Sequence, residues 1–295
     1  MQSNLNLSYI TKLLEHEKPQ SGLYIVPTPI GNLSDITIRS LKILSSVDLI
    51  MSEDTRVTKK LTSKYGIKSK IQSFHKFNSK NKIPGIIKKI SSNFSIAVTT
   101  DSGTPLISDP GADLVKECFE NNLSVFSLPG PSAPIASFVL ATFQAENFTF
   151  RGFFPREKKK IESQLARFNG SDCPEIYFES PKRIIKTLNA ILELSGDCKI
   201  TFVRELTKKH EEIINTNISD LLEKISLKEK ILGEITFIIE PIMSKITKLP
   251  EEEIIKFGNS LLNKGMNISE VSRLMSKDLS ISKRDIYQLL IKNRK

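Results

Sequence analysis

The sequence has no tryptophan, only three cysteines in 295 residues, and no long apolar run. A bilayer-spanning helix needs about 20 consecutive apolar residues, so none is expected. Cys118, Cys173 and Cys198 lie far apart without a CxxC pair, which argues against a zinc site or a disulfide framework. We expect no bound metal and a reducing, cytoplasmic location. Residues 1–21 lack the basic start and apolar core of a signal peptide, and we expect a flexible extension there.

Negative charge is scarce relative to positive charge. Lys and Arg outnumber Asp and Glu by 43 to 33, and the formal net charge is +10. Such a surplus favours an anionic partner, most often nucleic acid. A biased, AT-rich genome that fills solvated faces with lysine explains the same surplus, and composition alone leaves both explanations open.

Short apolar segments alternate with amphipathic ones through the first half of the chain. This alternation is typical of a parallel sheet flanked by helices. We expect strands at 22–30, 48–53, 71–74, 95–100 and 123–128. We expect helices at 37–46, with Asp35 as its cap, and at 55–65, 84–92 and 113–121.

The second half has a different pattern, which predicts a second, mixed α/β domain. Its expected strands are 148–154, 175–180, 199–206, 211–215 and 234–241, with helices starting at Ser180–Pro181 and near Ile218. From about Leu249, three short helices resemble a helix-turn-helix module, although a lid or a dimerisation element fits as well. The expected division is therefore an extension (1–21), an N-terminal α/β domain (22–130), a second α/β domain (131–245) and a helical C-terminal module (246–295).

Turns rich in glycine and proline follow several expected strands, while GxGxxG and GxxxxGK[ST] are both missing. These turns are PTPIGNL (27–33), SEDTR (52–56), TDSGTPLISDPG (100–111) and LPGPSA (128–133). Ligands of open α/β sheets bind beyond the carboxyl ends of strands, so we expect the four turns to converge on one crevice. Gly103 and Gly130 permit close backbone approach, and the prolines stiffen the loops. Each of the four turns, considered alone, fits equally well with an ordinary tight turn that binds no ligand.

Six stretches together resemble one family. In chain order they are LYIVPTPIGNLSDIT, DLIMSEDTR, DSGTPLISDPG, LPGPSA, YFESPKR and VRELTKKHE, between about Leu23 and Pro241. They resemble the motifs of the ribosomal RNA small-subunit methyltransferase I group, within the tetrapyrrole-methylase-like (class III) S-adenosylmethionine enzymes. The resemblance implies two α/β domains with a cleft that binds folded S-adenosylmethionine. It also implies 2′-O-methylation of a cytidine in the decoding region of 16S rRNA, by a homodimer.

The resemblance and the chemistry of the reaction together nominate site residues. By motif, the cofactor-binding residues would be Pro29, Asp101, Ser102, Gly103, Thr104, Ile107, Ser132, Ala133, Phe178, Glu179 and Leu206. A ribose hydroxyl is a poor nucleophile until it loses its proton, so a general base is expected. The catalytic candidates are Asp101, Glu179, Glu205 and Lys208. The RNA-binding candidates are Arg56, His75, Arg183, Arg204, Lys283 and Arg284.

Bland alternatives remain for several of these residues. The Arg and Glu candidates fit a structural ion-pair network between the domains, and His75 fits a satisfied loop histidine. Two other functions also stay open: a corrin or porphyrin methyltransferase of the same fold, and a non-catalytic RNA-binding assembly factor. The basic surplus and the helical tail favour an RNA substrate over a small tetrapyrrole.

Overall fold

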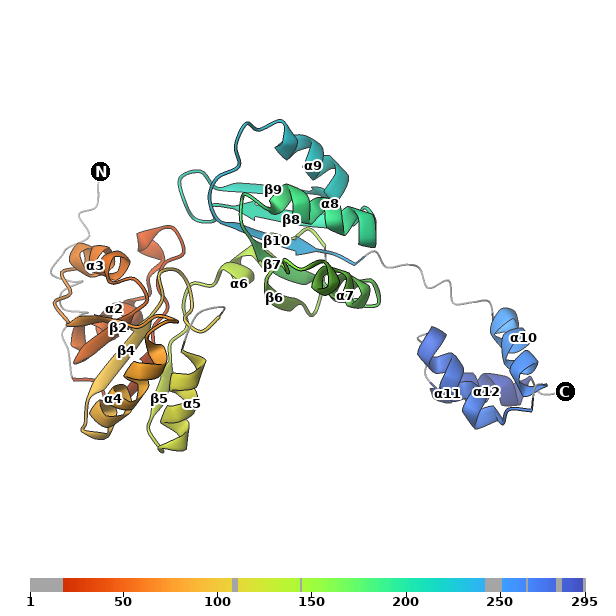
Figure 1. Ribbon diagram of the computed structural model, residues 1–295, viewed down its shortest axis with the longest axis horizontal. Helices are drawn as coiled ribbons and strands as arrows, with labels where there is room; N and C mark the ends of the chain where they lie inside the picture. The colour runs from red at the N-terminus through yellow and green to blue at the C-terminus, as the bar shows by residue number, and fades with distance from the viewer. Residues whose placement is uncertain are drawn as a thin grey trace, which may run out of the picture. The chain divides into compact units, whose positions relative to one another are not determined.

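The computed structural model describes residues 18–107, 111–143, 145–241, 251–263, 265–279 and 283–293. The chain divides into two compact units, Met1–Pro241 and Ile242–Lys295. The first unit holds two five-stranded sheets, and the second holds a cluster of helices (Figure 1). The finer boundary expected near residue 130 stays a prediction. Within the described ranges, no helix is both long enough and apolar enough to cross a membrane.

The first sheet is entirely parallel, as the alternating pattern predicted. Its strands are β1 (Gly22–Ile25), β2 (Leu49–Ser52), β3 (Ile71–Ser73), β4 (Ser95–Thr99) and β5 (Val125–Ser127), in the order β3-β2-β4-β1-β5. The helices α2 (Ile38–Ser46) and α3 (Thr55–Lys64) pack on one face, and α4 (Ser79–Ser91) and α5 (Ala112–Glu120) pack on the other. The part of the chain around this sheet is the first lobe, and the part around the second sheet is the second lobe. The core of the first lobe has two layers, one on each face of the sheet, and Cys118 is buried in one of them.

The second sheet is mixed, which also confirms the prediction. Its strands are β6 (Thr149–Phe153), β7 (Glu175–Glu179), β8 (Lys199–Arg204), β9 (Glu212–Asn217) and β10 (Ile235–Ile239), in the order β6-β7-β10-β8-β9. Only β6 and β7 pair in parallel. The helices α7 (Lys158–Asn169), α8 (Ile184–Ser195) and α9 (Ile218–Ser226) bury one face of this sheet. The short helix α6 (Ala133–Phe138) joins the two sheets and contacts β7 and β10 (Figure 1).

The cap predicted for α2 is wrong. Thr37 caps this helix, because its Oγ1 accepts a hydrogen bond of 3.0 Å from the backbone N–H of Ser40. Asp35 instead ends a short 3-10 helix, Leu33–Asp35, whose preceding Asn32 accepts from the N–H of Ser34. The capping residue of α2 is therefore two positions later in the chain than predicted.

Two other helices begin elsewhere than predicted. The helix α4 starts at Ser79, so Pro84, where the helix was predicted to begin, is its sixth residue and lies inside it. The helix α8 starts at Ile184 and not at Ser180–Pro181. The carbonyl of Ser180 accepts from the N–H groups of both Arg183 and Ile184, so a separate turn precedes the helix.

The second unit contains α10 (Glu251–Leu262), α11 (Ile268–Leu279) and α12 (Lys283–Lys292), which match the three predicted helices. They share a small core of buried residues, Ile254, Val271, Met275, Ile286 and Leu290. Asn267 caps α11 by accepting from the N–H of Glu270, whose carboxylate accepts in return from the N–H of Asn267. This reciprocal pair fixes where α11 begins.

Candidate active site

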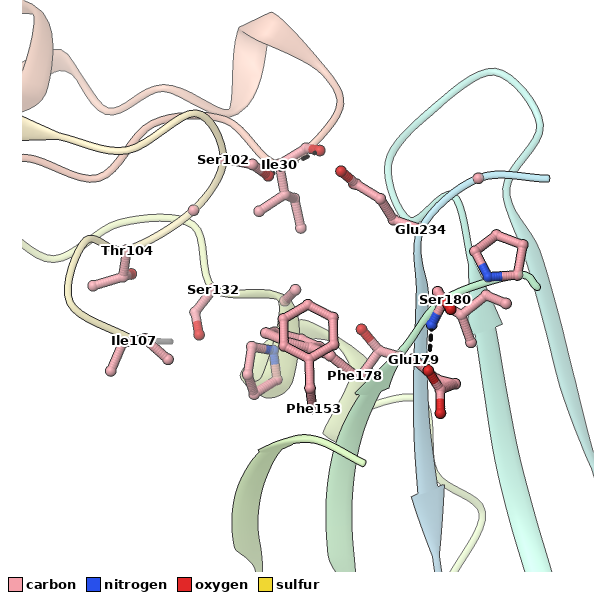
Figure 2. Close-up of a pocket in the computed structure, with 17 residues that line it drawn as sticks. Ile30, Ser102, Thr104, Ile107, Ser132, Phe153, Phe178, Glu179, Ser180 and Glu234 are labelled. Atoms are coloured by element: carbon pink, nitrogen blue, oxygen red, sulfur yellow. Dashed lines mark hydrogen bonds between the residues drawn. The ribbon is translucent and has the colours of Figure 1, made fainter. Parts of the chain in front are cut away.

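A cavity of about 370 Å³ lies where the turns of the first sheet meet the ends of β7 and β10 in the second sheet (Figure 2). Its volume lies within the range of roughly 300–1,000 Å³ that small-molecule sites occupy. The lining residues are Ile30, Ser102, Gly103, Thr104, Ile107, Ser132, Ala133, Pro134, Phe153, Phe178, Glu179, Ser180, Pro181, Gly233, Glu234, Ile235 and Thr236.

The turns on the first-sheet side hold one another in place. Thr28 and Gly103 exchange two backbone hydrogen bonds, of 2.9 and 3.0 Å. Gly103 has φ 81°, and a Cβ added there would lie 3.3 Å from Cγ2 of Ile30. The hydroxyl of Thr104 donates to the carbonyl of Pro131 at 2.9 Å, which links the turn 100–111 to the turn 128–133. The cavity wall is therefore formed before any ligand arrives, which reduces the cost of ordering it on binding.

The SEDTR turn does not line this cavity, so the predicted convergence holds for three of the four turns. Its strand, β2, pairs with β4 on the side away from β1, which places the turn one strand further out. Glu53 accepts a hydrogen bond of 2.8 Å from the hydroxyl of Thr100, and the N–H of Asp54 donates to Oδ1 of Asp101 at 2.9 Å. The SEDTR turn therefore supports Thr100 and Asp101, the first two residues of the turn 100–111.

Asp101 lies among carboxylates at this junction. Partial burial raises the pKa of Asp101, and the nearby charges of Glu53 and Asp54 raise it further. The hydrogen bond from the N–H of Asp54 and the charge of Arg56 oppose this increase. Arg56 itself pairs with Asp54 at 2.6 Å. A general base works best with a pKa near the working pH, so a raised pKa suits Asp101 to proton removal.

Glu179 is fully buried at the end of β7, and its carboxylate is fully engaged by the protein. Oε1 accepts from the N–H of Ser180 at 2.7 Å, and Oε2 accepts from the hydroxyl of Thr187 at 2.6 Å. Arg183 forms an ion pair with Oε2 at 3.2 Å and donates to the carbonyl of Pro155 at 2.7 Å. These contacts favour a positioning role for Glu179.

Glu205 and Lys208 follow β8 and form an ion pair with each other. Nζ of Lys208 lies 2.9 Å from Oε1 of Glu205 and 2.8 Å from Oε2 of Glu234. The hydrogen bond from Lys208, followed by that from the backbone N–H of Glu234, lowers the pKa of Glu205. A Cβ added at Gly233 would lie 2.4 Å from Cγ of Glu205, so only glycine fits beside this carboxylate. Of these residues, Gly233 and Glu234 line the cavity.

The RNA-binding candidates fall into two groups. Arg183 and Arg204 are largely buried and already bound: Arg204 contacts Glu212 at 2.8 Å and the carbonyl of Leu232. Their contacts favour the alternative of an ion-pair network within the second lobe. Arg56, Lys283 and Arg284 are exposed, the last two in the first turn of α12.

His75 lies beyond β3, at the far edge of the first sheet. Its Nε2 lies 3.0 Å from Nδ2 of Asn78, and its Nδ1 is buried without a hydrogen-bond partner. The Asn78 side chain also accepts from the N–H of His75, so this turn is held locally. A role in RNA binding stays a prediction for each of these residues.

Eight of the residues expected to hold the cofactor line the cavity. They are Ser102, Gly103, Thr104, Ile107, Ser132, Ala133, Phe178 and Glu179, whereas Pro29, Asp101 and Leu206 lie outside it. Leu206 lies against Gly31, because a Cβ added to that glycine would be 2.7 Å from the Leu206 carbonyl oxygen. Binding by any of these residues remains a prediction.

The residues that sequence reasoning missed come mainly from β6 and β10. Gly233, Glu234, Ile235 and Thr236 lie at the start of β10, whereas ligands of open α/β sheets are expected at the carboxyl ends of strands. Since β10 is antiparallel to β7, its amino end lies beside the carboxyl end of β7. The glycine before this strand was the available signal. Among the described residues, no cluster of His, Cys, Asp or Glu could hold a metal ion.

The paired α/β lobes and the cavity at their strand ends define the class of the protein. The chain belongs to the tetrapyrrole (corrin/porphyrin) methylases, whose family model matches residues 22–222. Two solved structures share the fold at low sequence identity. Diphthine synthase has a TM-score of 0.59 at 11% identity, covering 74% of this chain and 89% of that one. Cobalt precorrin-4 methyltransferase has a TM-score of 0.52 at 17% identity, covering 74% and 94%.

Within that class, the chain belongs to the ribosomal RNA small subunit methyltransferase I family. The protein of this name from Thermotoga maritima is 42% identical over 217 residues, covering 74% of this chain and 97% of the relative. The one from Bacillus subtilis is 36% identical over 272 residues, covering 90% and 92%. The family resemblance read from the six motifs is thereby confirmed, and the chain is a member of a methyltransferase family.

Proposed function

We propose that this protein transfers a methyl group from S-adenosylmethionine to the 2′-hydroxyl of a cytidine in the decoding region of 16S rRNA. The observation that carries the proposal is the preformed cavity between two lobes in a chain of this family. The net charge of +10 supports a polyanionic substrate. The specific atom, nucleotide and region come from the family resemblance.

The residues that line the cavity fit S-adenosylmethionine. Its volume suits a ligand of this size, and its walls combine apolar surface from Phe178 and Ala133 with hydroxyls from Ser102 and Ser132. Gly103 keeps side-chain bulk out of the cofactor loop. The charged side chains that line the cavity, Glu179 and Glu234, are both acidic, and each is already paired with a cation of the chain, Arg183 and Lys208 respectively.

The chemistry divides between the cofactor and the chain. S-adenosylmethionine, when bound, supplies a methyl group activated by a sulfonium. The chain must orient the ribose and remove its proton. Alignment alone contributes up to about 7–11 kcal/mol in the most favourable intramolecular reactions. We assign proton removal to Asp101, because its pKa is raised and because it directly precedes Ser102, which lines the cavity. Glu179 and Arg183 fix the wall of the cavity through their mutual contacts.

Labelled S-adenosylmethionine tests this proposal directly. We expect label in 16S rRNA or in small ribosomal subunits, located on a cytidine ribose by nucleoside mass spectrometry. A precorrin substrate incubated in parallel tests the tetrapyrrole alternative. Label in the precorrin alone would replace the proposal, and cofactor binding without transfer to either substrate would favour an assembly factor.

The assembly and location implied by the family are further proposals. We expect a homodimer, which sedimentation equilibrium of the purified chain would reveal. A cytoplasmic location follows from the proposed ribosomal substrate. Fractionation of cells that express a tagged chain would measure it.

A further inference from the structure

An exposed aromatic ring projects from the second sheet at the rim of the cavity. Phe153 ends β6, lines the cavity and is 62% exposed. Its ring packs edge-to-face on Phe178, with centroids 5.6 Å apart, and Phe178 packs in the same way on Phe150 at 5.0 Å. Figure 2 shows Phe153 beside Phe178, at the border of the open space that Ser132 and Glu234 also edge. One side of the ring is therefore supported while much of its surface stays open.

A β-bulge gives Phe153 this direction. Phe150 pairs with Ile176, and Phe153 pairs with Phe178. Between these two pairs β6 advances by three residues while β7 advances by two, so β6 contains one extra residue. Gly152, inside the bulge, has φ 72°, a conformation that favours glycine. Without the extra residue, strict alternation would turn Phe153 to the opposite face of the sheet. Bulges next to active sites commonly re-aim a side chain in this way.

The chain that follows Phe153 is anchored and then strongly basic. Arg183 donates to the carbonyls of Phe154 and Pro155, at 3.2 and 2.7 Å, and so ties this backbone to Glu179. Beyond Pro155 comes the basic segment, Arg156–Lys160, in which four of five side chains are cationic and all five residues are exposed.

Two cations of the basic segment are free for a partner. Lys160 pairs with Glu157 at 2.9 Å, and Lys158 lies 4.0 Å from Glu162, both exposed contacts of small energetic weight. Arg156 and Lys159 have no acidic partner among the described residues. Aromatic rings beside a basic track are the usual elements of single-strand nucleic-acid binding, in which bases stack and cations hold phosphates.

We propose that Phe153 and the basic segment form a docking surface for a single-stranded stretch of the RNA substrate. Phe153 stacks on an unpaired base at the mouth of the cavity, and Arg156 and Lys159 contact the phosphates beside it. This inference rests on the proposed function. It adds a positioning residue and a phosphate track that direct the substrate toward the cavity.

Binding measurements on the full chain separate this surface from the cofactor site. Fluorescence anisotropy with a labelled unstructured RNA oligonucleotide, and with the same strand in a duplex, reports RNA affinity. Calorimetry reports S-adenosylmethionine affinity. We expect Phe153→Ala to weaken single-strand binding about 10-fold, to affect the duplex less, and to change cofactor affinity less than it changes RNA affinity, because Phe153 lies at the rim of the cavity. Phe153→Trp should retain affinity, because stacking needs only an aromatic face.

A variant that lacks two cations of the basic segment tests the phosphate contacts through the salt dependence of RNA binding. Arg156→Gln combined with Lys159→Gln should reduce the slope of log K against log salt by about 1.4, because each single-strand phosphate contact contributes about 0.7. Lys186→Gln combined with Lys224→Gln removes the same charge from exposed positions on α8 and α9, outside the basic segment, and should change the slope less. Phe119→Ala on α5, a side chain 64% exposed, is the aromatic control.

The outcomes distinguish this inference from the proposed function. If the unsubstituted chain methylates rRNA but Phe153→Ala leaves RNA affinity and the KM for RNA unchanged, the docking surface is wrong and the function stands. A loss confined to S-adenosylmethionine affinity would also overturn it and assign Phe153 to the cofactor. If the unsubstituted chain neither binds nor methylates RNA, both proposals fail.

Discussion

The backbone N–H of Asn32 donates a hydrogen bond of 3.0 Å to Oγ1 of Thr207, 175 positions further along the chain. Asn32 follows β1 of the first sheet, and Thr207 follows β8 of the second. Thr207 has φ 62°, a conformation that is strained for a β-branched residue and costs on the order of 1–3 kcal/mol. Its neighbours Leu206 and Lys208 also lie against Gly31. The loop after β8 is therefore held in a costly shape where it meets the first lobe.

Gly31→Ala should disturb this contact. The added Cβ would lie 2.5 Å from Cγ of Lys208 and 2.6 Å from Oγ1 of Thr207, so the two loops must separate. We expect S-adenosylmethionine affinity, measured by calorimetry, to fall at least about 10-fold, because small misplacements at a preorganised site have large effects. Gly85→Ala, in α4, adds the same methyl group to open space and should leave affinity intact. Equal affinity in the two variants would contradict a role for the contact.

Asp101→Asn should remove activity while preserving the fold. The amide oxygen still accepts from the N–H of Asp54, and the raised pKa of Asp101 shows that its ionised form is disfavoured in the folded protein. We expect kcat to fall by about 10²–10⁴ and the thermal midpoint to stay level or rise. Wild-type kcat should increase with pH as Asp101 loses its proton. Asp172→Asn, at an exposed position outside the site, is the control, and full activity of the Asp101 variant would exclude it as the base.

Glu179→Gln should act on stability more than on the chemical step. The amide cannot neutralise Arg183, and breaking one side of a buried ion pair costs about 3–5 kcal/mol. Arg183 is partly exposed, so we expect a loss near the lower end, measured by urea unfolding. Thr187→Val, which removes one donor to the same carboxylate, should cost about 1–3 kcal/mol. A large fall in kcat with unchanged stability would instead show that Glu179 acts in catalysis.

Glu205 should contribute a pH-dependent part of the stability. The hydrogen bonds from Lys208 and from the Glu234 N–H lower its pKa in the folded state, so its stabilising effect is complete above the ordinary glutamate pKa of about 4.3. The effect disappears as the pH falls below that value and through the lower, folded-state pKa. Glu205→Gln should therefore reduce the thermal midpoint at pH 7, and the difference from wild type should shrink in acid.

Glu229→Gln, an exposed carboxylate outside this network, is the matched control for the pH series. It should follow the wild-type melting curve more closely than Glu205→Gln at neutral pH. A Glu205 variant whose deficit is the same at every pH would show that the charge of Glu205 is not what stabilises the loop.

The sequence by itself determined the two α/β lobes, the strands, the family and most of the residues that line the cavity on the first-sheet side. Apolar periodicity and turn chemistry are local, so the parallel sheet and the turn at Gly103 follow from a few neighbouring residues. Helix starts were less secure: a cap at Asp35 or a start at Ser180 satisfies the same local rules as Thr37 and Ile184 do.

Only the tertiary structure decided what the candidate side chains contact. The path of the chain placed Arg183 and Thr187 on the carboxylate of Glu179, joined Glu205 to Lys208 and to the remote Glu234, and left Asp101 outside the cavity lining. The structure also placed the amino end of an antiparallel strand in the cavity and turned Phe153 toward it through a bulge. Strand order and register arise from contacts between residues far apart in the chain, and a local reading of the sequence does not contain them.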